Sequence, residues 1–491
     1  MKVKFKKWVS VTAASILLAA SFLGTATTAS ADEVKERTIA DESIYDLLVD
    51  RFFNGVGTND FDTNAKDPTK FAGGDFQGMI DKIDFIGDMG FSIISIGSIF
   101  SNEKYEGSLP TSYTDIEKHF GTKKELKKVI ETFNKRKMEI MIDFPLNNVS
   151  ANHEWAQDSA KKDWIASSKD GIVQWDLANK DVQAALIDAA TQFVSTYAVG
   201  GVRLTNLQGA DTAFINDMIK ALKAENKELY IISNEESDAK FDAIFEAATN
   251  GIYRDIFKNV DRDSSKLLEP VAGDRPAQIM MDTLDTERFT FQATKEDMFQ
   301  PTRMKMVLGA MFTLPGIPVI QYGTEIAMSG ESAPDTQQFY NFKVNEELVE
   351  YVGDLQVLRN QSETLRTGKF EVIKNEDGLL AFKRSSKDET WIIMINNTSK
   401  TQRVDFTFDE LGKDKEIKGT LESEIIRAND KDVYPVILDR EMVEIYQVKD
   451  DTGINMSYVI ALGFVYVFFT VFVIVIIRRG KKRRQQQDIA K

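Results

Sequence analysis

Three segments of the chain end in side chains that can take part in acid–base or nucleophilic chemistry. Asp143 follows the β-rich run at residues 138–142, Thr205 closes the segment 201–205, and Glu235 lies just past the run at 229–232. A carboxylate can transfer a proton or attack directly, whereas a hydroxyl attacks only when a base removes its proton. If these runs are parallel strands whose ends meet, the three groups belong to one site.

The elements that would position them alternate between strand and helix from residue 42 to residue 361. The β-rich runs lie at residues 91–96, 138–142 and 229–232, and the helical stretches at residues 123–135, 182–197 and 212–224. Strand–helix alternation over about 300 residues favours a parallel α/β architecture, and a (β/α)8 TIM barrel fits the length.

A different pattern occupies residues 365–448. Short alternating runs predict a small antiparallel β domain. They lie at residues 369–373, 379–384, 390–395, 402–408 and 442–447.

Both ends of the chain carry membrane-directed patterns. Residues 1–31 are basic, then apolar, and close on Ala29-Ser30-Ala31, which predicts a cleaved signal peptide, with an uncleaved anchor as the alternative. After a polar linker at residues 449–456, residues 457–477 are apolar and uncharged, and a basic tail follows at 478–491. This order predicts a single transmembrane helix with the tail in the cytoplasm and everything before it outside the cell.

Composition narrows the functional classes. The formal net charge is −15, and the one compact basic block is the tail, so nucleic acid is not an expected partner. The chain has no Cys and only two His, which excludes disulfides and Cys-based metal sites.

A series of motifs, in order, resembles the α-amylase family, glycoside hydrolase family 13. They are Asp-Arg-Phe-Phe-Asn-Gly at 50–55, Gly-Gly-Asp-Phe-Gln-Gly at 73–78, Met-Asp-Thr-Leu-Asp-Thr-Glu-Arg-Phe at 281–289 and Pro-Gly-Ile-Pro-Val-Ile-Gln-Tyr-Gly-Thr-Glu at 315–325. The resemblance implies a TIM barrel followed by a β-sandwich. It also implies a site at the C-terminal strand ends, where a carboxylate nucleophile and a carboxylic acid lie about 5–5.5 Å apart.

The resemblance carries over to the site only in part. Asp143 and Arg203 match sugar-site positions, and Asp285 matches the carboxylate that stabilises the transition state. Thr205 stands where the family has its nucleophilic Asp. The general-acid position falls on Asn234 without a gap, or on Glu235 after a shift of one residue.

The family's sugar-binding groups around the catalytic carboxylates also differ. Three His positions hold Glu106, Asn148 and Leu284 instead. Tyr105 matches the aromatic residue that stacks under a glucosyl ring, a contact that an aromatic face can provide.

Calcium is a further implication of the resemblance. The residues that match a calcium-binding loop of part of the family are Asn54, Asn59, Asp60, Gly73 and Asp75. Such oxygen ligands suit Ca²⁺, but Val56 replaces one expected ligand. A polar turn whose Asn and Asp side chains bind local backbone is the alternative.

The sequence therefore predicts a single-pass cell-membrane protein with an amylase-like ectodomain that does not cleave sugars. Such a protein would bind an α-glucan or cell-surface glycan, or a membrane protein partner, or serve as a spacer. The alternative is an α-glucan-hydrolysing glycosidase in which carboxylates among Glu106, Asp143, Glu235 and Asp285 activate a water. Direct displacement by water needs two carboxyl groups about 6.5–9.5 Å apart.

Overall fold

The structure is a computed structural model that describes residues 37–269, 274–343, 346–451, 453 and 456–489. The chain divides into two compact units, Met1–Thr38 and Ile39–Lys491, and every element described below belongs to the second. The predicted signal peptide at residues 1–31 lies outside the described residues.

Seven parallel strands form the central sheet, in the order β8-β7-β3-β2-β1-β10-β9. Their bounds are β1 Ile44–Asp46, β2 Ile93–Ser95, β3 Glu139–Pro145, β7 Gly201–Thr205, β8 Tyr230–Ile232, β9 Gln278–Met280 and β10 Ile317–Gln321. Residues 242–244 close the circle between β8 and β9. The Asp242 N–H donates to the Ile231 carbonyl at 2.9 Å, and Ile244 forms a parallel bridge to Ala277. The predicted (β/α)8 barrel is confirmed.

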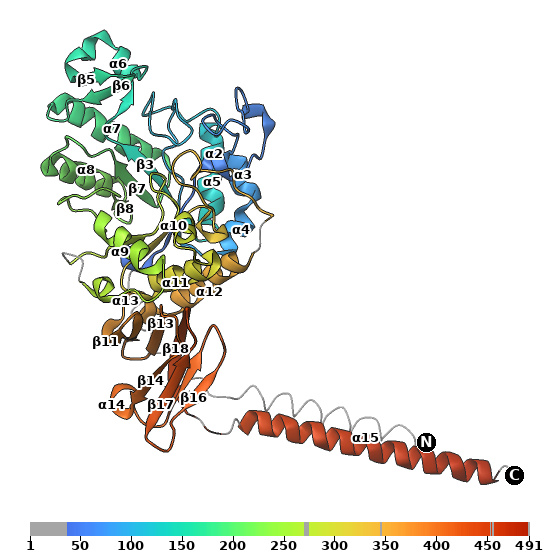
Figure 1. Cartoon of the computed structure of the whole chain (residues 1–491). Helices are drawn as coiled ribbons and strands as arrows, with labels where there is room; N and C mark the ends of the chain where they lie inside the picture. Colours follow the sequence, from blue (N-terminus) through green and yellow to red (C-terminus); the bar gives the residue numbers. More distant parts are fainter. Residues whose placement is uncertain (1–36, 270–273, 344–345, 452, 454–455, 490–491) are drawn as a thin grey trace. The chain divides into compact units, whose positions relative to one another are not determined.

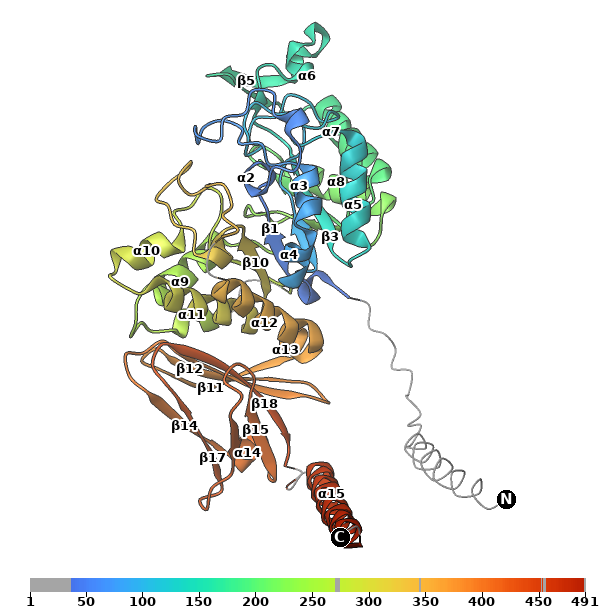
Figure 2. The ribbon, with the colours of Figure 1, turned by 90° about the vertical axis from the view of Figure 1, so that its right-hand side faces the viewer.

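Helices cover the outside of this barrel (Figures 1 and 2). They are α2 Val49–Phe52, α3 Phe76–Asp81, α4 Ile83–Asp88, α5 Lys123–Asn134, α7 Lys180–Thr196, α8 Thr212–Glu225, α9 Ala247–Phe257, α10 Phe289–Lys295, α11 Gln300–Thr313, α12 Glu347–Gln361 and α13 Glu363–Thr367. Helix α5 shows why the sequence pattern predicted them. Thr122 and Glu125 form a capping box at its start, and Leu126, Val129, Ile130 and Phe133 bury one face.

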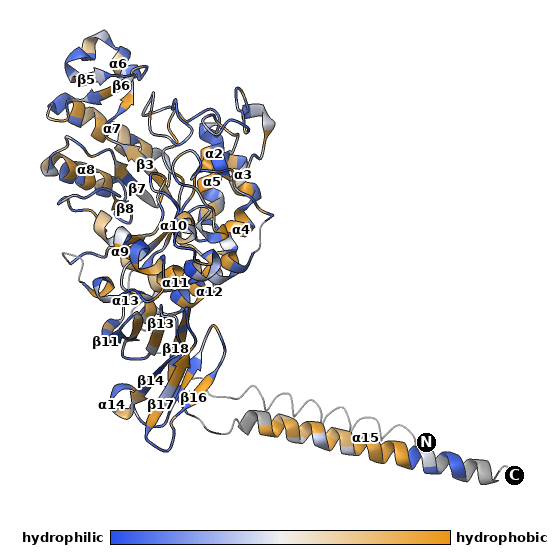
Figure 3. Cartoon of the chain, in the orientation of Figure 1, coloured by the Kyte–Doolittle hydropathy of each residue, from blue (hydrophilic) through white to orange (hydrophobic). Residues whose placement is uncertain are grey.

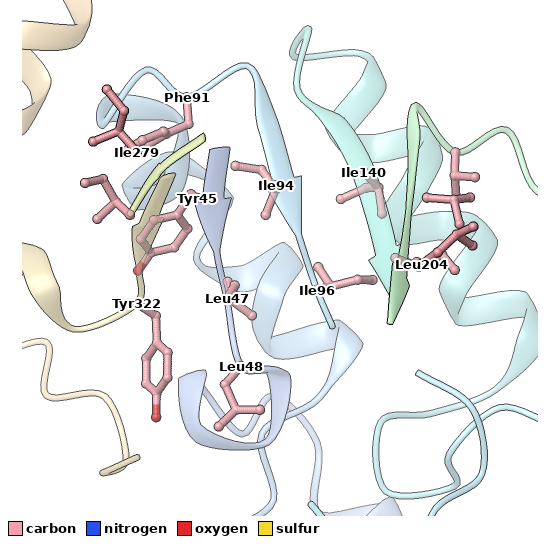
Figure 4. Close-up of a cluster of buried hydrophobic side chains, with 14 of the residues drawn as sticks. Tyr45, Leu47, Leu48, Phe91, Ile94, Ile96, Ile140, Leu204, Ile279 and Tyr322 are labelled. Carbon is pink, nitrogen blue, oxygen red and sulfur yellow. The ribbon is translucent and has the colours of Figure 1, made fainter. Parts of the chain in front are cut away.

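The core lies between the strands and these helices, and Figure 4 shows part of it. Ile94, Ile140 and Leu204 come from three neighbouring strands and are fully buried. Each such side chain contributes roughly 1.5–3 kcal/mol of burial free energy, so the core fixes the strand ends on which the site is built.

A small three-stranded sheet is inserted between β3 and α7, and the sequence pattern did not predict it. Its order is β4-β6-β5, with β4 Val149–Ser150, β5 Ile165–Lys169 and β6 Ile172–Trp175, and the short helices α6 Glu154–Gln157 and η4 Ser159–Trp164 precede β5. Its core is a group of rings around the buried His153, which contacts Tyr113, Trp155 and Trp175 at centroid distances of 4.8–5.4 Å.

The C-terminal domain is antiparallel, as predicted. A six-stranded sheet has the order β11-β12-β13-β18-β15-β16, and β14 pairs with β17 in a second sheet. The bounds are β11 Lys369–Glu376, β12 Leu379–Ser385, β13 Thr390–Asn396, β14 Gln402–Thr407, β15 Lys415–Gly419, β16 Ile425–Arg427, β17 Val433–Leu438 and β18 Met442–Asp450.

Strands β12 and β13 of the larger sheet are buried on both faces. Ala381, Ile392 and Met394 pack in one cluster with Phe406 and Val436 of the smaller sheet. The alternate residues of the same strands, including Phe382, Ile393 and Ile395, belong to the barrel's core cluster. Because the two domains share one apolar core, we expect them to fold as one unit.

Helix α15 spans Met456–Ile489. Its segment Val459–Lys481 is long and apolar enough to cross a membrane by length and composition, and none of it is buried in the protein. At a rise of 1.5 Å per residue, 23 residues extend about 34 Å, close to a hydrocarbon core of about 30 Å. Figure 3 shows the apolar band along α15 and the hydrophilic end that follows it.

Candidate functional site

A cleft of about 200 Å³ opens at the C-terminal ends of the barrel strands. Polar residues at or just after six of the barrel strands, β1, β3, β7, β8, β9 and β10, line this cleft. They are Asp46, Asp143, Arg203, Thr205, Asn206, Asn234, Asp285 and Gln321. Parallel strands bring these ends together, as the sequence motifs require. The cleft also includes Tyr105, Glu106 and Ser108 from the loop after β2.

Arg203 is the centre of the charge network in this cleft. Its Nη1 and Nη2 donate to the two carboxylate oxygens of Asp46 at 2.9 and 2.7 Å, and Nη2 also donates to the Ser95 hydroxyl at 2.7 Å. Its Nε lies 3.4 Å from the Asp143 Oδ1. Asp46 was not predicted as a site residue, although it ends the first strand of the barrel.

Asp143 keeps a proton more readily than an ordinary carboxyl. Burial raises the pKa of Asp143 to about 6, against the lowering effect of Arg203, and the nearby Asp46 charge adds to the rise. Burial therefore favours the neutral form of Asp143, which can donate a proton.

Thr205, which the resemblance predicts to stand at the nucleophile position, brings a hydroxyl and no carboxylate to the cleft. Thr205 is the last residue of β7, is half-buried, and lines the cleft beside Asp143 and Arg203. Asn206 follows in a left-handed conformation (φ 55°) and turns the chain away from the strand. A glycosyl ester forms only on a carboxylate, so Thr205 cannot form one, and its hydroxyl would attack as an alcohol only after a base had removed its proton.

The register after β8 places Asn234 in the cleft and Glu235 outside its lining. The Glu235 carboxylate accepts hydrogen bonds from the backbone N–H groups of Asn206 and Leu207, the latter at 3.0 Å. The Ser233 hydroxyl fixes this turn by donating to the Leu204 carbonyl at 2.8 Å. Glu235 therefore braces the turn after β7, and Asn234 presents an amide to the cleft.

Asp285 lines the cleft from the loop after β9 and is exposed. Its backbone N–H donates to the Thr283 hydroxyl at 3.3 Å. The neighbouring Leu284 carbonyl accepts a hydrogen bond from the Gln337 amide at 3.0 Å. This leaves the Asp285 side chain available to solvent or to a bound molecule.

Tyr105 lies in the cleft, but another side chain stacks on its ring. The Arg51 guanidinium carbon is 3.7 Å from the ring centroid, and the Tyr105 hydroxyl donates to the Gln337 Oε1 at 2.6 Å. Tyr105 is only 6% exposed. A sugar ring that stacked on the Arg51 side would have to displace this cation–π contact.

The residues of the predicted calcium loop lie together, but they are not equally available. The Asp75 carboxylate accepts from the backbone N–H groups of Gly55, Val56 and Gly78, which occupies both of its oxygens. The Asn59 Oδ1, by contrast, is buried without a hydrogen-bond partner.

The remaining two side chains of this loop meet beside Gly73. The Asn54 amide donates to both oxygens of Asp60 at 2.9 Å. A Cβ added at Gly73 would lie 2.6 Å from the Asn54 Nδ2 and 2.7 Å from the Asp60 Oδ1. Within the described residues, no cluster of three or more acidic or His side chains could hold a metal.

Comparison with known proteins identifies the family. The family model of the α-amylase catalytic domain matches residues 46–176, and that of the α-amylase C-terminal domain matches residues 368–446. The catalytic-domain match includes Asp143 but ends before Arg203, Thr205, Asn234 and Asp285.

Solved structures and curated relatives agree with these matches. An α-amylase from Anoxybacillus is 34% identical with a TM-score of 0.81, and one from Geobacillus thermoleovorans, complexed with acarbose, is 32% identical with a TM-score of 0.80. Both alignments cover 85% of this chain and 100% of the other.

Among curated relatives, a cyclomaltodextrinase from Geobacillus thermopakistaniensis is 26% identical over 76% of this chain and 72% of its own length. The chain spans about 37% of the beta/alpha-amylase of Paenibacillus polymyxa, to which it is 26% identical. The chain belongs to the α-amylase family, glycoside hydrolase family 13.

Proposed function

We propose that the chain is an α-glucan-binding member of the α-amylase family that does not cleave glycosides through a covalent intermediate. The observation that carries the proposal is the pair Thr205 and Asn234, which line the cleft where a nucleophile and an acid are needed. Double displacement needs both carboxyl groups, one to attack and one to protonate the leaving oxygen. Of the three catalytic carboxylates, only Asp285 is retained.

Two observations support saccharide binding at this cleft. Its lining offers hydroxyl, amide and carboxylate groups that can pair with sugar hydroxyls, among them Ser108, Asn206, Asn234 and Gln321. The related α-amylase from Geobacillus thermoleovorans was solved with acarbose. Neutral hydroxyl and amide groups can bind a sugar through hydrogen bonds without providing a nucleophile that attacks its anomeric carbon.

Hydrolysis by direct attack of water is the second candidate, and the relatives favour it because they are amylases and cyclomaltodextrinases. The cleft holds a group for each role. Asp143, with its pKa raised to about 6, would protonate the leaving oxygen, and Asp285 would activate the water. Arg203 and Asp46 would hold Asp143 in place.

Binding and turnover measured on one preparation separate the two candidates. The full chain in lipid nanodiscs is titrated with maltoheptaose by calorimetry, and reducing ends are counted in the same mixture. The proposal expects saturable binding that Asn234→Ala weakens, and no reducing ends above a protein-free blank. The second candidate would be established if reducing ends appear and Asp143→Asn or Asp285→Asn abolishes them. The control Glu410→Gln, on the C-terminal domain, should leave them unchanged. Absence of any binding would contradict the proposal.

We also propose that α15 anchors the protein in the cell membrane, with the barrel outside and the tail inside. The apolar length of Val459–Lys481 and the basic residues that follow Ile477 support this orientation. Protease added to intact cells should remove the barrel but leave the tail, and truncation after residue 451 should release the protein. A tail that is cleaved from outside would contradict the orientation. Pull-down from such membranes would reveal a membrane protein partner.

Calcium binding at the loop is proposed as a weak interaction. Asn54, Asn59, Asp60 and the Gly73 carbonyl would hold the ion, and the partnerless Asn59 Oδ1 supports this assignment. Bound there, the ion would supply a positive charge that neutralises Asp60 and cross-links the loop. Asp75 would not be a ligand, because its carboxylate caps helix α3.

A further inference from the structure

A second, larger cavity lies at the opposite end of the barrel. It has a volume of about 660 Å³ and is lined by residues that precede β9 and β10, by α9, and by residues of β11 and β12. Because the strands are parallel, residues before them lie at the far end from the cleft described above. The cavity is therefore separate from the proposed saccharide site.

The body of this cavity is apolar. Ile252 and Tyr253 of α9, Leu267 and Leu268 of the short helix η5 (Ser265–Leu268), and Phe370 of β11 line it. Its size falls within the roughly 300–1,000 Å³ typical of small-molecule sites, which are mostly apolar with a few polar groups.

Arg384 of β12 lines the cavity and is 1% exposed. Its two terminal nitrogens donate to the carbonyls of Thr313 at 3.2 Å and Arg366 at 3.1 Å, while its Nε has no hydrogen-bond partner. No described carboxylate lies within ion-pair distance of it, and burial lowers its pKa to about 10. Its basic neighbour Arg366 is paired with Asp41 at 3.0 Å.

A buried charge without a counter-ion is costly, and a guanidinium does not escape the cost by losing its proton. Other charged residues that line the cavity do not provide a negative counter-ion for Arg384, because basic and acidic side chains are mixed there. Lys266 and Arg275 stand there beside Glu246, Glu269 and Asp274, all of them at least partly exposed. A ligand that brings its own anion into the cavity would pair with Arg384.

We propose that this cavity binds an amphipathic carboxylate, with its anionic head at Arg384 and its apolar chain along Leu267, Leu268 and Phe370. Arg suits this role because its planar donors match a carboxylate. The site is independent of the proposed α-glucan function.

Calorimetry on the full chain in phosphatidylcholine nanodiscs tests the proposal, with empty nanodiscs as the blank. The probes are hexanoate, 1-hexanol and acetate, which separate the contributions of head and chain. We expect one saturable hexanoate site, with hexanol and acetate at least tenfold weaker. Equal affinity for hexanol and hexanoate, or heats that match empty nanodiscs, would overturn the proposal.

Two variants locate the site. Arg384→Gln should weaken hexanoate at least tenfold and leave hexanol unchanged. Because Arg384 is buried, the melting curve of the Arg384→Gln variant is recorded first to show that it folds. Leu268→Trp is a second variant, which fills the cavity from a half-buried position without changing the charge. Leu268→Trp should abolish hexanoate binding, whereas Arg403→Gln, on an exposed position of β14, should not. Unchanged binding in Leu268→Trp would refute the location.

Discussion

Arg203 is held by Asp46, on the first strand, rather than by a residue at the nucleophile position two residues along its own strand. The two side chains form a pair of hydrogen bonds of 2.7 and 2.9 Å, and Arg203 is 4% exposed. The guanidinium therefore has a carboxylate partner that does not depend on position 205. The barrel mouth can keep its charge network without a carboxylate at position 205.

Removing this partner should destabilise the barrel strongly. Asp46→Asn leaves the buried Arg203 with the more distant Asp143 as its carboxylate partner, and breaking a buried pair of this kind typically costs about 3–5 kcal/mol. Denaturant unfolding measures the change. Ser95→Ala, which removes a single hydrogen bond to Arg203, should cost about 1 kcal/mol. Equal, small effects of both substitutions would show that Asp46 does not hold Arg203.

Restoring both missing carboxylates should be needed to restore cleavage. Thr205→Asp supplies a nucleophile and Asn234→Glu an acid, and neither alone completes the pair. Reducing ends from maltoheptaose should stay at the blank in each single variant and rise in the double variant. Loss of a catalytic nucleophile costs a factor on the order of 10⁴–10⁶, so the gain should be easy to detect. Full activity in Thr205→Asp alone would show that an acid is already present.

His153 should make the small inserted sheet sensitive to acid. Burial lowers the pKa of His153 to about 3 in the folded chain, from a usual value of 6.5. The unfolded chain therefore binds the proton first, and stability is lost as the pH falls from 6.5 towards 3. At pH 5 the loss is about 2 kcal/mol, and His153→Gln should not show it. Unfolding at pH 7 and pH 5 measures the difference.

The lowered pKa of His153 can be measured directly by NMR, because the chain contains only two His and their signals are easily distinguished. In a chain labelled at the imidazole carbons, one signal should not titrate above about pH 4. The other should titrate above 6.5, because hydrogen bonds from His119 to Glu117 and Asp62 raise its pKa although burial acts in the opposite sense. Two signals that both titrate near 6.5 would contradict the burial of His153.

Calcium should raise the melting temperature by a small amount that depends on Asp60. At a concentration ten times the dissociation constant, binding stabilises by about 1.4 kcal/mol. Asp60→Asn should abolish this response. Asp75→Asn replaces one of two accepting oxygens with an NH2 group that cannot accept from the backbone N–H groups around it, so it should lower the melting temperature and keep the response to calcium. Loss of the response in Asp75→Asn alone would assign the ion to Asp75 instead.

Much of the fold could be predicted from the sequence because strands and helices alternate regularly along the barrel. Helix α5 has a capping box and four apolar residues on one face, and the predicted range 123–135 agrees with Lys123–Asn134. The inserted sheet was not predicted because its strands are short and β5 is almost entirely exposed, so apolar alternation is weak there. Its stability comes from rings around His153, which are scattered along the sequence.

The site was harder to predict because it depends on backbone register. Asn234 and Glu235 are neighbours, and only the turn fixed by Ser233 decides which one lines the cleft. Tyr105 matches a sugar-stacking position, yet Arg51, 54 residues earlier in the chain, stacks on its ring. Such contacts join distant segments and leave no local pattern.

The most direct test of the account is the intact mass of the full chain after incubation with a fluorinated α-glucosyl fluoride, a reagent that accumulates glycosyl-enzyme intermediates. The account predicts no gain in mass for the natural chain and a gain of one fluoroglucosyl unit for the Thr205→Asp, Asn234→Glu double variant, with the anomeric fluoride as the leaving group. A glucosyl adduct on the natural chain would contradict the account, because it would show that the cleft forms the covalent intermediate without a carboxylate at position 205.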